Sequence, residues 1–423
     1  MLGWCHHEFR RLRDADSDAR LIRLRYLAAF SALLPCALAL YVGLRIADLW
    51  RPVRMGTLNP KGRISIMVSY IDPYLRQLQS MGLKTILIVI NPGACPNSQL
   101  AAMYARVVWL IDDRHPWLRR VMQVTYRAFV VGSSMDARLR AGYMREFRNV
   151  WQASPALSFT AQEQAAGRAL LARLGLTPSA PYVCWGVREA AYYRQFLDPG
   201  ARRRAQYLNT EADEDTYIRN PPLGNYLPML TQCAEQGLYV VRMGQVVGAQ
   251  LPSGLHPNVV DYAAKHRSPF GDIYLLATCK FAVSGGAGLW NVVSAFNRPV
   301  VLTDSYFLQY RPLRQGDLFI PKMVWLIAEK RFLTFKEMLT AHMRYTYASN
   351  CRRDGVELLH STPGQIAAVV REMNERLDGT WCETEEDQEL QRRFSSLYTP
   401  DQYGYGMPGR IGAEFLRQHA ELL

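Results

Sequence analysis

Residues 239–304 decide the fold of this chain, and they read YVVRMGQ (239–245), VVDYAAK (259–265), FGDIYLLATCKFAVSGGAGLWNVVSAF (270–296) and NRPVVLTD (297–304). Buried strands alternate there with helices. The strands end in Arg242-Met243-Gly244, in Ser284-Gly285-Gly286-Ala287-Gly288 and in Asp304. Gly-rich turns between a strand and a helix hold phosphates, because backbone N–H groups converge at the turn. This stretch therefore predicts a parallel α/β fold and a phosphate-bearing ligand.

Length and composition indicate a folded chain with more than one domain. A chain of 423 residues is too long for a single hydrophobic core. Its contents of 49% hydrophobic and 21% charged residues are those of a globular protein. The net charge of +13 favours anionic partners such as nucleotides, phosphorylated lipids or acidic membranes, with a generic basic surface as the alternative. No block of like charge resembles a nucleic-acid-binding arm, so we expect no nucleic acid partner. The eight scattered cysteines form no CxxC pair, which favours buried free thiols.

An uncharged run near the N-terminus, YLAAFSALLPCALALYVGL at 26–44, is about long enough to span a bilayer core. Six arginines lie between Arg10 and Arg25, and more basic residues follow the run, so the charges do not decide its orientation. Pro35 favours a kink in the middle. Two arrangements stay open: a kinked helix that enters and leaves one leaflet, and a plain N-terminal anchor. Both predict attachment to a membrane surface.

The next segments alternate strand and helix up to a turn-rich boundary. A strand is predicted at 63–70 (RISIMVSY), and a helix is expected to open at Pro73 with Asp72 as its cap. The run KTILIVI (84–90) has the apolar, β-branched character of a strand that is covered on both faces. A helix and the strand VVWLID follow. The sequence TPSAP at 177–181 marks the expected domain boundary.

The alternation of strand and helix in both halves predicts an α/β protein with two facing Rossmann-like domains. We expect a basic N-terminus with the hydrophobic helix at 1–60, and the two Rossmann-like domains at 61–177 and 178–380. C-terminal helices occupy 381–423, and one option for them is to pack back on the N-terminal domain.

Two arginines stand at predicted strand ends. Ligands of open parallel sheets bind at the carboxyl ends of the strands, where this chain has Arg188 and Arg242. A guanidinium binds phosphate bidentately and stays charged, so each arginine could stabilise the charge that grows on a leaving diphosphate. We therefore predict catalytic roles for both, with an ion pair to a carboxylate at the sheet edge as the alternative for each.

Further residues near the strand ends could contact such a ligand. Asp261 and Tyr262 could flank a base or ribose, whereas Asp272 most simply caps a helix, with a sugar hydroxyl as its other possible partner. Arg219 and Asn220 precede a helix, which Asn220 could cap. The candidates for phosphate contacts in the turns are Gly244, Ser284, Gly285, Gly286 and Gly288. The turn alone is a weak signal, because SGGAG could simply be a tight turn between a strand and a helix. It matches neither a Walker A loop nor the dinucleotide fingerprint.

A general base is harder to place. Transfer to a hydroxyl acceptor needs a carboxylate or histidine that faces the ligand. Asp72, at the end of the strand predicted at 63–70, is the best candidate, and helix capping is its alternative role. The histidines show no metal spacing, so no metal site is predicted.

Several longer motifs carry a resemblance when they are taken together. They are RNPPLGNYLPML (219–230), YVVRMG (239–244), VDYA (260–263) and the segment from DIYLLATCKFAVSGG to RPVVLTD (272–304). NSQLAAMYARVVWLID (97–112) and STPGQIAAVVREMNERLDGTW (361–381) agree with them. The set resembles a bacterial family of glycosyltransferases linked to surface-polysaccharide and lipopolysaccharide gene clusters, and the resemblance covers residues 60–423.

The resemblance implies a GT-B fold, in which the C-terminal domain binds a nucleotide-sugar donor and the N-terminal domain binds the acceptor. It implies a lipid-linked or polysaccharide acceptor, no cofactor, no obligatory metal, and a place on the cytoplasmic side of the bacterial inner membrane. Two departures matter. RISIMVSY lacks the Gly-His pair that many such enzymes carry, and Ala287-Gly288 stands where the family has Ser-Gly. A non-catalytic GT-B scaffold that binds a nucleotide or glycan is therefore the alternative, and an epimerase or hydrolase of the same fold is more distant.

Overall fold

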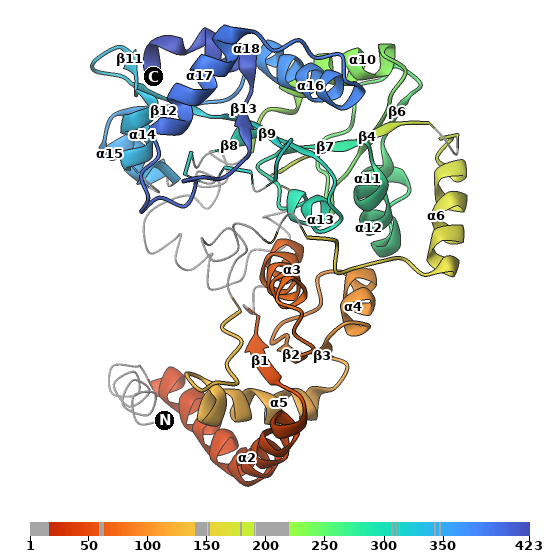
Figure 1. Cartoon of the computed structure of the whole chain (residues 1–423), viewed down its shortest axis with the longest axis vertical. Coiled ribbons are helices and arrows are strands. Elements are labelled where there is room, and N and C mark those ends of the chain that lie inside the picture. The colour runs from red at the N-terminus through yellow and green to blue at the C-terminus, as the bar shows by residue number, and fades with distance from the viewer. Residues whose placement is uncertain are drawn as a thin grey trace. The chain divides into compact units, whose positions relative to one another are not determined.

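The chain forms two compact units, each built on a parallel sheet (Figure 1). The first unit comprises Met1–Gly142 and Ala156–Ser158, and the second comprises Tyr143–Pro155 and Phe159–Leu423. The computed structural model describes residues 17–58, 63–139, 150, 153–177, 180–189, 191, 220–305, 308–309, 311–312, 314–341, 344–346 and 348–423.

The division between the units lies earlier in the chain than the boundary expected at 177–181. Helix α6 (Ala161–Arg173) belongs to the second unit. Its Gly167 lies so close to Tyr274 that a Cβ atom at this position would come within 2.0 Å of the ring. Phe159 packs against the same ring, with the centroids 5.2 Å apart. Aromatic packing therefore joins α6 to the second unit.

Three parallel strands in the order β1-β2-β3 form the sheet of the first unit. The strands are β1 (Val53–Thr57), β2 (Ile86–Ile90) and β3 (Trp109–Ile111). The helices of this unit are α2 (Ser17–Trp50), α3 (Ile64–Ser80), α4 (Ser98–Ala105), α5 (Pro116–Thr125) and the π-helix η1 (Tyr126–Val130). The strands expected within 84–90 and in VVWLID are confirmed. In α2, the segment Leu27–Trp50 is long and apolar enough to cross a membrane by length and composition alone.

The strand predicted at 63–70 is wrong, because these residues form the start of α3. Short apolar runs do not distinguish strand from helix by periodicity alone, and here Met67, Val68, Ile71 and Leu75 form one buried helical face. Pro73 lies inside α3 and does not open it. The first strand is β1, which lies within residues 1–60, where we expected a basic N-terminus with the hydrophobic helix.

Seven described strands form the sheet of the second unit, in the order β13-β9-β8-β7-β4-β5-β6, and every pair is parallel. They are β4 (Tyr182–Val187), β5 (Tyr239–Arg242), β6 (Val259–Val260), β7 (Phe281–Gly285), β8 (Val300–Ser305), β9 (Leu318–Pro321) and β13 (Arg410–Ile411). Every residue of β4 and β7 is buried. The continuous apolar runs in the sequence correspond to these covered central strands.

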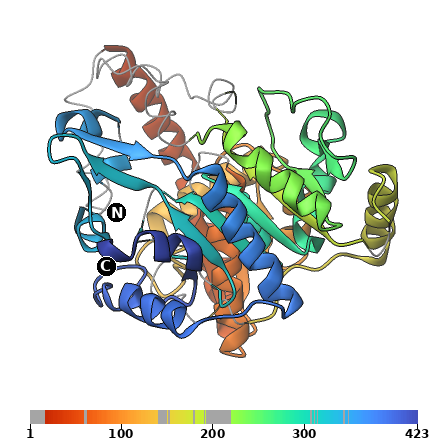
Figure 2. The same ribbon diagram turned by 90° about the horizontal axis from the view of Figure 1, so that it is seen from above.

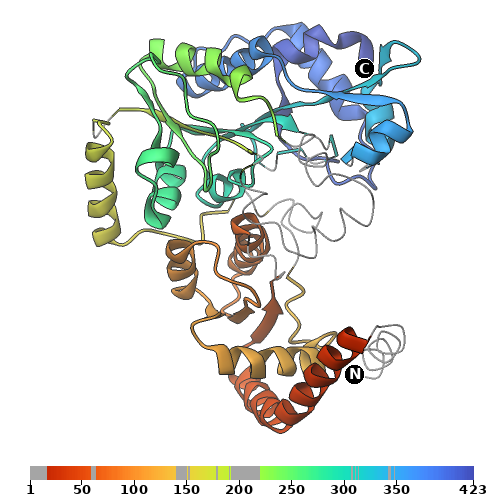
Figure 3. The same ribbon diagram turned by 180° about the vertical axis from the view of Figure 1, so that it is seen from behind.

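Helices cover both faces of this sheet (Figures 1 and 3). One face carries α10 (Leu227–Glu235) and α16 (Pro363–Asp378), and the other carries α11 (Tyr262–Lys265), α12 (Pro269–Thr278) and α13 (Trp290–Ala295). Figure 2 shows α10 and α16 side by side, and the Gln232 side chain donates to the Ala367 carbonyl between them at 3.2 Å. The second unit is therefore a three-layered, doubly wound α/β domain.

A small antiparallel sheet follows β9 in the chain, with strands in the order β11-β10-β12. Its strands are β10 (Met323–Leu326), β11 (Arg331–Phe332) and β12 (Val356–Leu359), and the helices between them are α14 (Phe335–Ala341), the 3-10 turn η5 (Arg344–Thr346) and α15 (Ala348–Arg353). The side chain of Thr362 then caps α16. This insertion places His360 and Ser361 directly before the N-terminus of α16.

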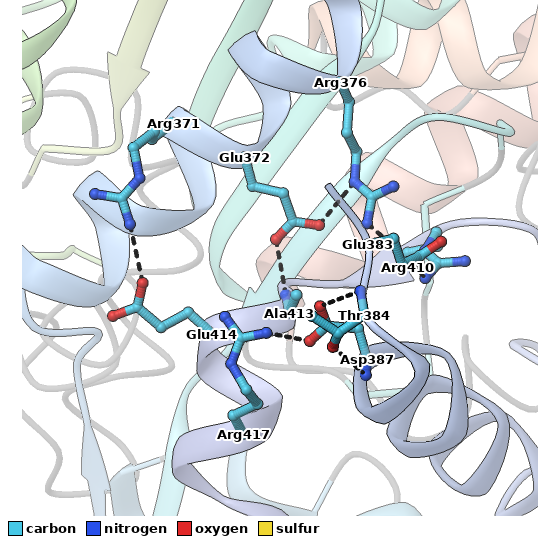
Figure 4. Close-up of polar contacts among 10 residues, drawn as sticks. All are labelled: Arg371, Glu372, Arg376, Glu383, Thr384, Asp387, Arg410, Ala413, Glu414 and Arg417. Atoms are coloured by element: carbon cyan, nitrogen blue, oxygen red, sulfur yellow. Dashed lines mark hydrogen bonds and ion pairs between the residues drawn. The ribbon is translucent and has the colours of Figure 1, made fainter. Parts of the chain in front are cut away.

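The last helices, α17 (Glu385–Ser396) and α18 (Ala413–Gln418), are part of the core of the second unit. Glu372 of α16 is buried, and its carboxylate accepts from the backbone N–H of Ala413 at 2.7 Å and from Arg376 at 2.8 Å. Further ion pairs join Arg371 to Glu414, Arg376 and Arg410 to Glu383, and Arg417 to Asp387 (Figure 4). This polar network fixes the C-terminal helices against α16.

Candidate functional site

The strand order of the second unit reverses between β4 and β7. From β4 the chain runs outward through β5 and β6, and it then crosses to β7 and continues outward through β8 and β9. Such a switch point is where open α/β sheets bind ligands, outside the carboxyl ends of the strands. Val187 pairs with Gly285 there, and the backbone N–H of Arg188 donates to the Gly285 carbonyl at 3.0 Å. The structure thus brings Arg188 and the Gly-rich turn together at the switch point.

The Gly-rich turn is shaped by close contacts that need glycine. A Cβ atom at Gly285 would lie 2.2 Å from the Tyr226 hydroxyl. Gly286 has a φ of 66°, in the left-handed region that favours glycine. The Ser284 hydroxyl donates to the Ala287 carbonyl at 2.9 Å, and the Gly288 carbonyl accepts from Asn291 at 3.3 Å. Ser284 therefore stabilises the turn itself, and backbone N–H groups are the donors that remain for an anion.

Arg242 forms ion pairs with carboxylates at the sheet edge, which was the alternative to a catalytic role. Its side chain is 2% exposed and lies 2.7 Å from Glu189 and 3.1 Å from Asp261. It also donates to the Ala249 carbonyl at 2.8 Å. Glu189 in turn accepts from the backbone N–H groups of Gly248 and Ala249. Arg242 therefore holds the ends of β4, β5 and β6 to the segment at 248–249.

The other candidates on this flank are also engaged in the fold. Asp261 caps α11 by accepting from the Ala264 N–H at 3.3 Å. The Tyr262 hydroxyl is buried and donates to Asp272 at 3.2 Å, and Asp272 pairs with Arg267 at 2.7 Å. Burial raises the pKa of Asp272 to about 6. Asp272 does not cap α12, because the Ser268 side chain does so.

Two further candidates stand apart from these contacts. A Cβ atom at Gly244 would come within 2.9 Å of the Val247 side chain, so Gly244 permits a close turn after β5. The side-chain oxygen of Asn220 is buried and finds no hydrogen-bond partner among the described residues. Arg219 lies outside the described residues.

Asp72 is not placed at a strand end. It lies within α3 in the first unit, is fully buried, and forms an ion pair with Arg76 at 2.7 Å. Burial raises the pKa of Asp72 to about 6, although Arg76 opposes this shift. The expectation that Asp72 follows a strand or caps a helix is therefore wrong, because the preceding segment is helical and continues past it.

The sequence prediction missed a buried polar cluster at the ends of β8 and β9. Asp304 has a φ of 52°, a left-handed conformation that residues other than glycine adopt at an energetic cost. Its carboxylate accepts from the Tyr226 hydroxyl at 3.0 Å and from the backbone N–H of Ser361 at 2.9 Å. The Tyr226 hydroxyl also lies 2.7 Å from the Thr303 hydroxyl. Because the same hydroxyl lies against Gly285, this cluster adjoins the Gly-rich turn.

Lys322 and His360 complete what we name the Asp304 cluster (Tyr226, Thr303, Asp304, Lys322, His360 and Ser361). The Lys322 ammonium lies 3.0 Å from Nδ1 of His360, and that nitrogen lies 3.2 Å from Asp304. Burial lowers the pKa of Lys322 to about 8, against the attraction of Asp304. Burial alone would raise the pKa of Asp304, but the hydrogen bond from His360 and the charge of Lys322 bring it below its usual value.

A strained, buried carboxylate beside an imidazole and a lysine is an arrangement typical of functional sites. The sequence contained part of this signal, because Asp304 and Lys322 each lie at the end of an apolar strand. Within the ranges that the structure describes, no group of three or more His, Cys, Asp or Glu side chains could hold a metal ion.

Comparisons with known proteins reveal only remote likeness. No protein-family model matches the chain, and no curated protein matches it in sequence. A solved structure of the iron-containing dodecameric glycosyltransferase TibC from enterotoxigenic E. coli H10407 is 14% identical, with 62% of each chain covered and a TM-score of 0.33. This chain thus spans less than two thirds of the length of TibC.

Two other solved structures show the same degree of likeness. The E. coli ADP-heptose lipopolysaccharide heptosyltransferase II is 12% identical over 59% of this chain and 84% of its own, with a TM-score of 0.36. A family 9 glycosyl transferase from Veillonella parvula DSM 2008 is 9% identical over 62% of this chain and 82% of its own, with a TM-score of 0.33. Likeness at this level carries no argument about function, which depends on the site itself.

Proposed function

We propose that this chain is a glycosyltransferase that moves a sugar from a nucleotide-sugar donor to a lipid-linked or surface-polysaccharide acceptor, without a metal ion, on the cytoplasmic side of the bacterial inner membrane. One observation carries this proposal: at the switch point of the seven-stranded sheet, Arg188 and the Gly-rich turn share the carboxyl edge. The family resemblance of the motifs around this edge supports the choice of a nucleotide sugar over other phosphate-bearing ligands.

The chemistry that this edge could perform is stabilisation of a leaving nucleoside diphosphate. As the bond between sugar and phosphate breaks, negative charge grows on the diphosphate. A guanidinium at Arg188 and backbone N–H groups of the turn at 285–288 would stabilise that charge more than they stabilise the bound donor. The Asp304 cluster would act indirectly, because its Tyr226 hydroxyl packs against Gly285 and so fixes the path of the turn.

Of the two arginines for which we predicted catalytic roles, we keep Arg188, whose backbone joins the Gly-rich turn, and not Arg242. A guanidinium that already binds two carboxylates has little net charge to offer a phosphate. Arg242 instead positions the loop at 248–249 beside the site. The buried side-chain oxygen of Asn220 has no partner in the described part of the chain, so it could accept a hydrogen bond from a hydroxyl of the nucleotide sugar.

Release of nucleoside diphosphate from a panel of nucleotide sugars tests this proposal. We expect Arg188→Ala to lower the release rate by about 100-fold or more, as is usual when one hydrogen-bond donor that stabilises the transition state is removed. Arg188→Lys should recover only a small part, since an ammonium cannot bind phosphate bidentately. The matched control is Arg173→Ala, an exposed arginine on α6, which should leave the rate unchanged.

Normal release by Arg188→Ala would remove this site from the proposal. Arg242→Ala cannot serve this purpose, because it leaves Glu189 and Asp261 without their partner and is expected to destabilise the sheet edge itself.

A non-catalytic protein that binds a nucleotide or glycan is the second candidate. The observation that favours it is the position of Asp72, the expected base, which is buried within α3 and paired with Arg76. Calorimetry distinguishes the two candidates. Heat of donor binding without any release of diphosphate, in the presence of membrane extracts as a source of acceptor, would favour the scaffold.

A further inference from the structure

Helix α2 presents one face to the core of the first unit. Its buried positions, Phe30, Ala37 and Leu44, recur every seven residues, and half-buried residues lie at steps of three and four between them. Such a spacing places these side chains on one stripe of the helix. Leu33 and Leu34 fill the stripe between Phe30 and Ala37, and Ala47 extends it toward the C-terminus.

This inner face is fastened to α5, η1 and the sheet. The Tyr41 ring stacks on Phe129 with the centroids 5.3 Å apart. The Thr125 hydroxyl lies 3.4 Å from the Ala37 carbonyl, and Leu44 belongs to the same apolar cluster as Met55 of β1. α2 is thus a structural layer of the first unit along most of its length (Figures 1 and 3).

The opposite face of α2 is exposed and apolar. Its large side chains Leu38, Val42, Ile46 and Leu49 lie at a spacing of three to four residues, and Trp50 follows Leu49 directly. Leu49 and Trp50 are 82% and 89% exposed. No charged residue occurs from 26 to 44, although the outer face of a water-exposed helix normally carries charges. This surface is therefore suited to a non-aqueous environment.

The composition of the two ends of this face indicates what covers it. Arg25 lies before the uncharged run, Arg45 and Arg51 lie after it, and all three side chains are exposed. Basic residues and a tryptophan beside an apolar helix face are typical of a helix at the surface of an anionic bilayer. A second copy of the chain would carry the same positive ends, which would repel each other.

A membrane crossing does not fit these contacts. A crossing helix would carry its inner partners into hydrocarbon, including the exposed Arg120 of α5 and Arg127 of η1. Charged side chains at that depth are costly. Nor can α2 separate freely from the unit, since only Arg51 and Pro52 stand between it and β1.

We infer that α2 lies in the plane of an anionic bilayer, with its outer face in one leaflet and its inner face on the first unit. This inference specifies the membrane attachment within the proposed function, and it does not depend on glycosyl transfer. It differs from both arrangements that the sequence left open, and it shares with the kinked helix the expectation that both ends lie on the same side of the membrane.

Flotation of the full-length protein with lipid vesicles tests whether the outer face binds a bilayer. We expect the chain to float with vesicles of phosphatidylcholine and phosphatidylglycerol, and less with phosphatidylcholine alone. The double variant Val42→Glu and Ile46→Glu should lower bound protein roughly tenfold or more, because both side chains face outward. The matched control, Leu377→Glu on an exposed position of α16, should bind like the wild type.

Binding by the double variant equal to that of the wild type would overturn the inference. So would a wild type that stays unbound while the double variant changes the oligomeric mass, because a second copy would then cover the face. Neither result would alter the diphosphate-release test, so a failure here is separate from a failure of the proposed function.

Cysteine labelling distinguishes a helix in the plane from a crossing helix. Arg25→Cys and Arg51→Cys are made separately in a chain whose Cys5, Cys36 and Cys382 are serine. A membrane-impermeant maleimide is added to sealed inverted inner-membrane vesicles. For a helix in the plane, both positions react before the vesicles are opened. Reaction of one position only after permeabilisation would show a crossing and overturn the inference.

Discussion

A buried guanidinium needs its charge balanced nearby, and Arg242 has carboxylates at 2.7 and 3.1 Å. Removing one partner from such a group is far more costly than the net gain of the pair. Glu189, Arg242 and Asp261 therefore act as a unit in which each residue depends on the other two. Arg188 differs in its setting, because its backbone is bonded to the Gly-rich turn at the switch point.

Lys322 offers a test of the Asp304 cluster through pH. Its pKa in the folded protein is about 8, against an ordinary value of 10.5. Between these values the unfolded chain binds a proton that the folded chain lacks, so the contribution of Lys322 to stability rises with pH through this window and is lost as pH falls through 8. We expect the unfolding free energy of the wild type, relative to Lys322→Met, to increase by about 3 kcal/mol from pH 8 to 10.5.

Urea unfolding of both proteins at several pH values measures this difference. The titration of groups that both proteins share contributes equally to the two unfolding free energies, so it cancels in their difference. A difference that stays constant over the window would show that Lys322 is not buried beside Asp304 as the structure has it.

The sequence predicted the positions of site residues along the chain better than their partners. Arg188 and the Gly-rich turn follow directly from strand ends, and they do meet. The carboxylate that neutralises Arg242 comes from Glu189, 53 residues away, and His360 reaches Asp304 from 56 residues away. Pairings at such separations depend on the order of strands in the sheet, which local patterns do not specify.

Helix α6 is held by a contact that only glycine allows, and this makes its docking testable. Gly→Ala within a helix ordinarily stabilises by about 0.5–1 kcal/mol. At Gly167 the new methyl would meet the Tyr274 ring at 2.0 Å, so we expect Gly167→Ala to destabilise the second unit and to increase amide exchange in α6. Gly364→Ala in α16 is the matched control, because no atom lies within 4 Å of its Cβ position and a small gain is expected.

Hydrogen exchange with mass spectrometry measures both effects. Equal protection of α6 in Gly167→Ala and the wild type would contradict the close packing on Tyr274.

At the scale of elements, most helices and strands of the second unit could be predicted, because its buried strands are continuous apolar runs between capped helices. The side chain of Thr362 caps α16 and Pro363 is its first residue, as residues of these types favour at the start of a helix. The errors lie in the first unit. RISIMVSY is rich in β-branched residues yet forms a helix, because its buried face has helical spacing. β1 carries Arg54 and Gly56 among only five residues, so it gives no clear strand signal.

The whole molecule consists of two units with separate cores, so a single unfolding transition is not expected. We predict two calorimetric transitions, and we predict that uridine, guanosine or adenosine diphosphate raises only the one that Gly167→Ala also shifts. A diphosphate at 100 times its dissociation constant should add about 2.7 kcal/mol to the stability of the unit that binds it. A ligand effect on the other transition would place the nucleotide in the first unit.

The junction of Arg51 and Pro52 has a consequence for the choice of acceptor. In the arrangement that we infer, only two residues join α2 to the first strand, so the sheet is held about one helix diameter, or 10 Å, from the outer face that lies in the leaflet. An acceptor hydroxyl can meet this unit only if it stays near the headgroup layer. Sugars close to a lipid phosphate satisfy this condition, whereas the distal end of a long glycan chain does not. Under the proposed function, the length of the acceptor would therefore be limited by this short connection rather than by the shape of a pocket.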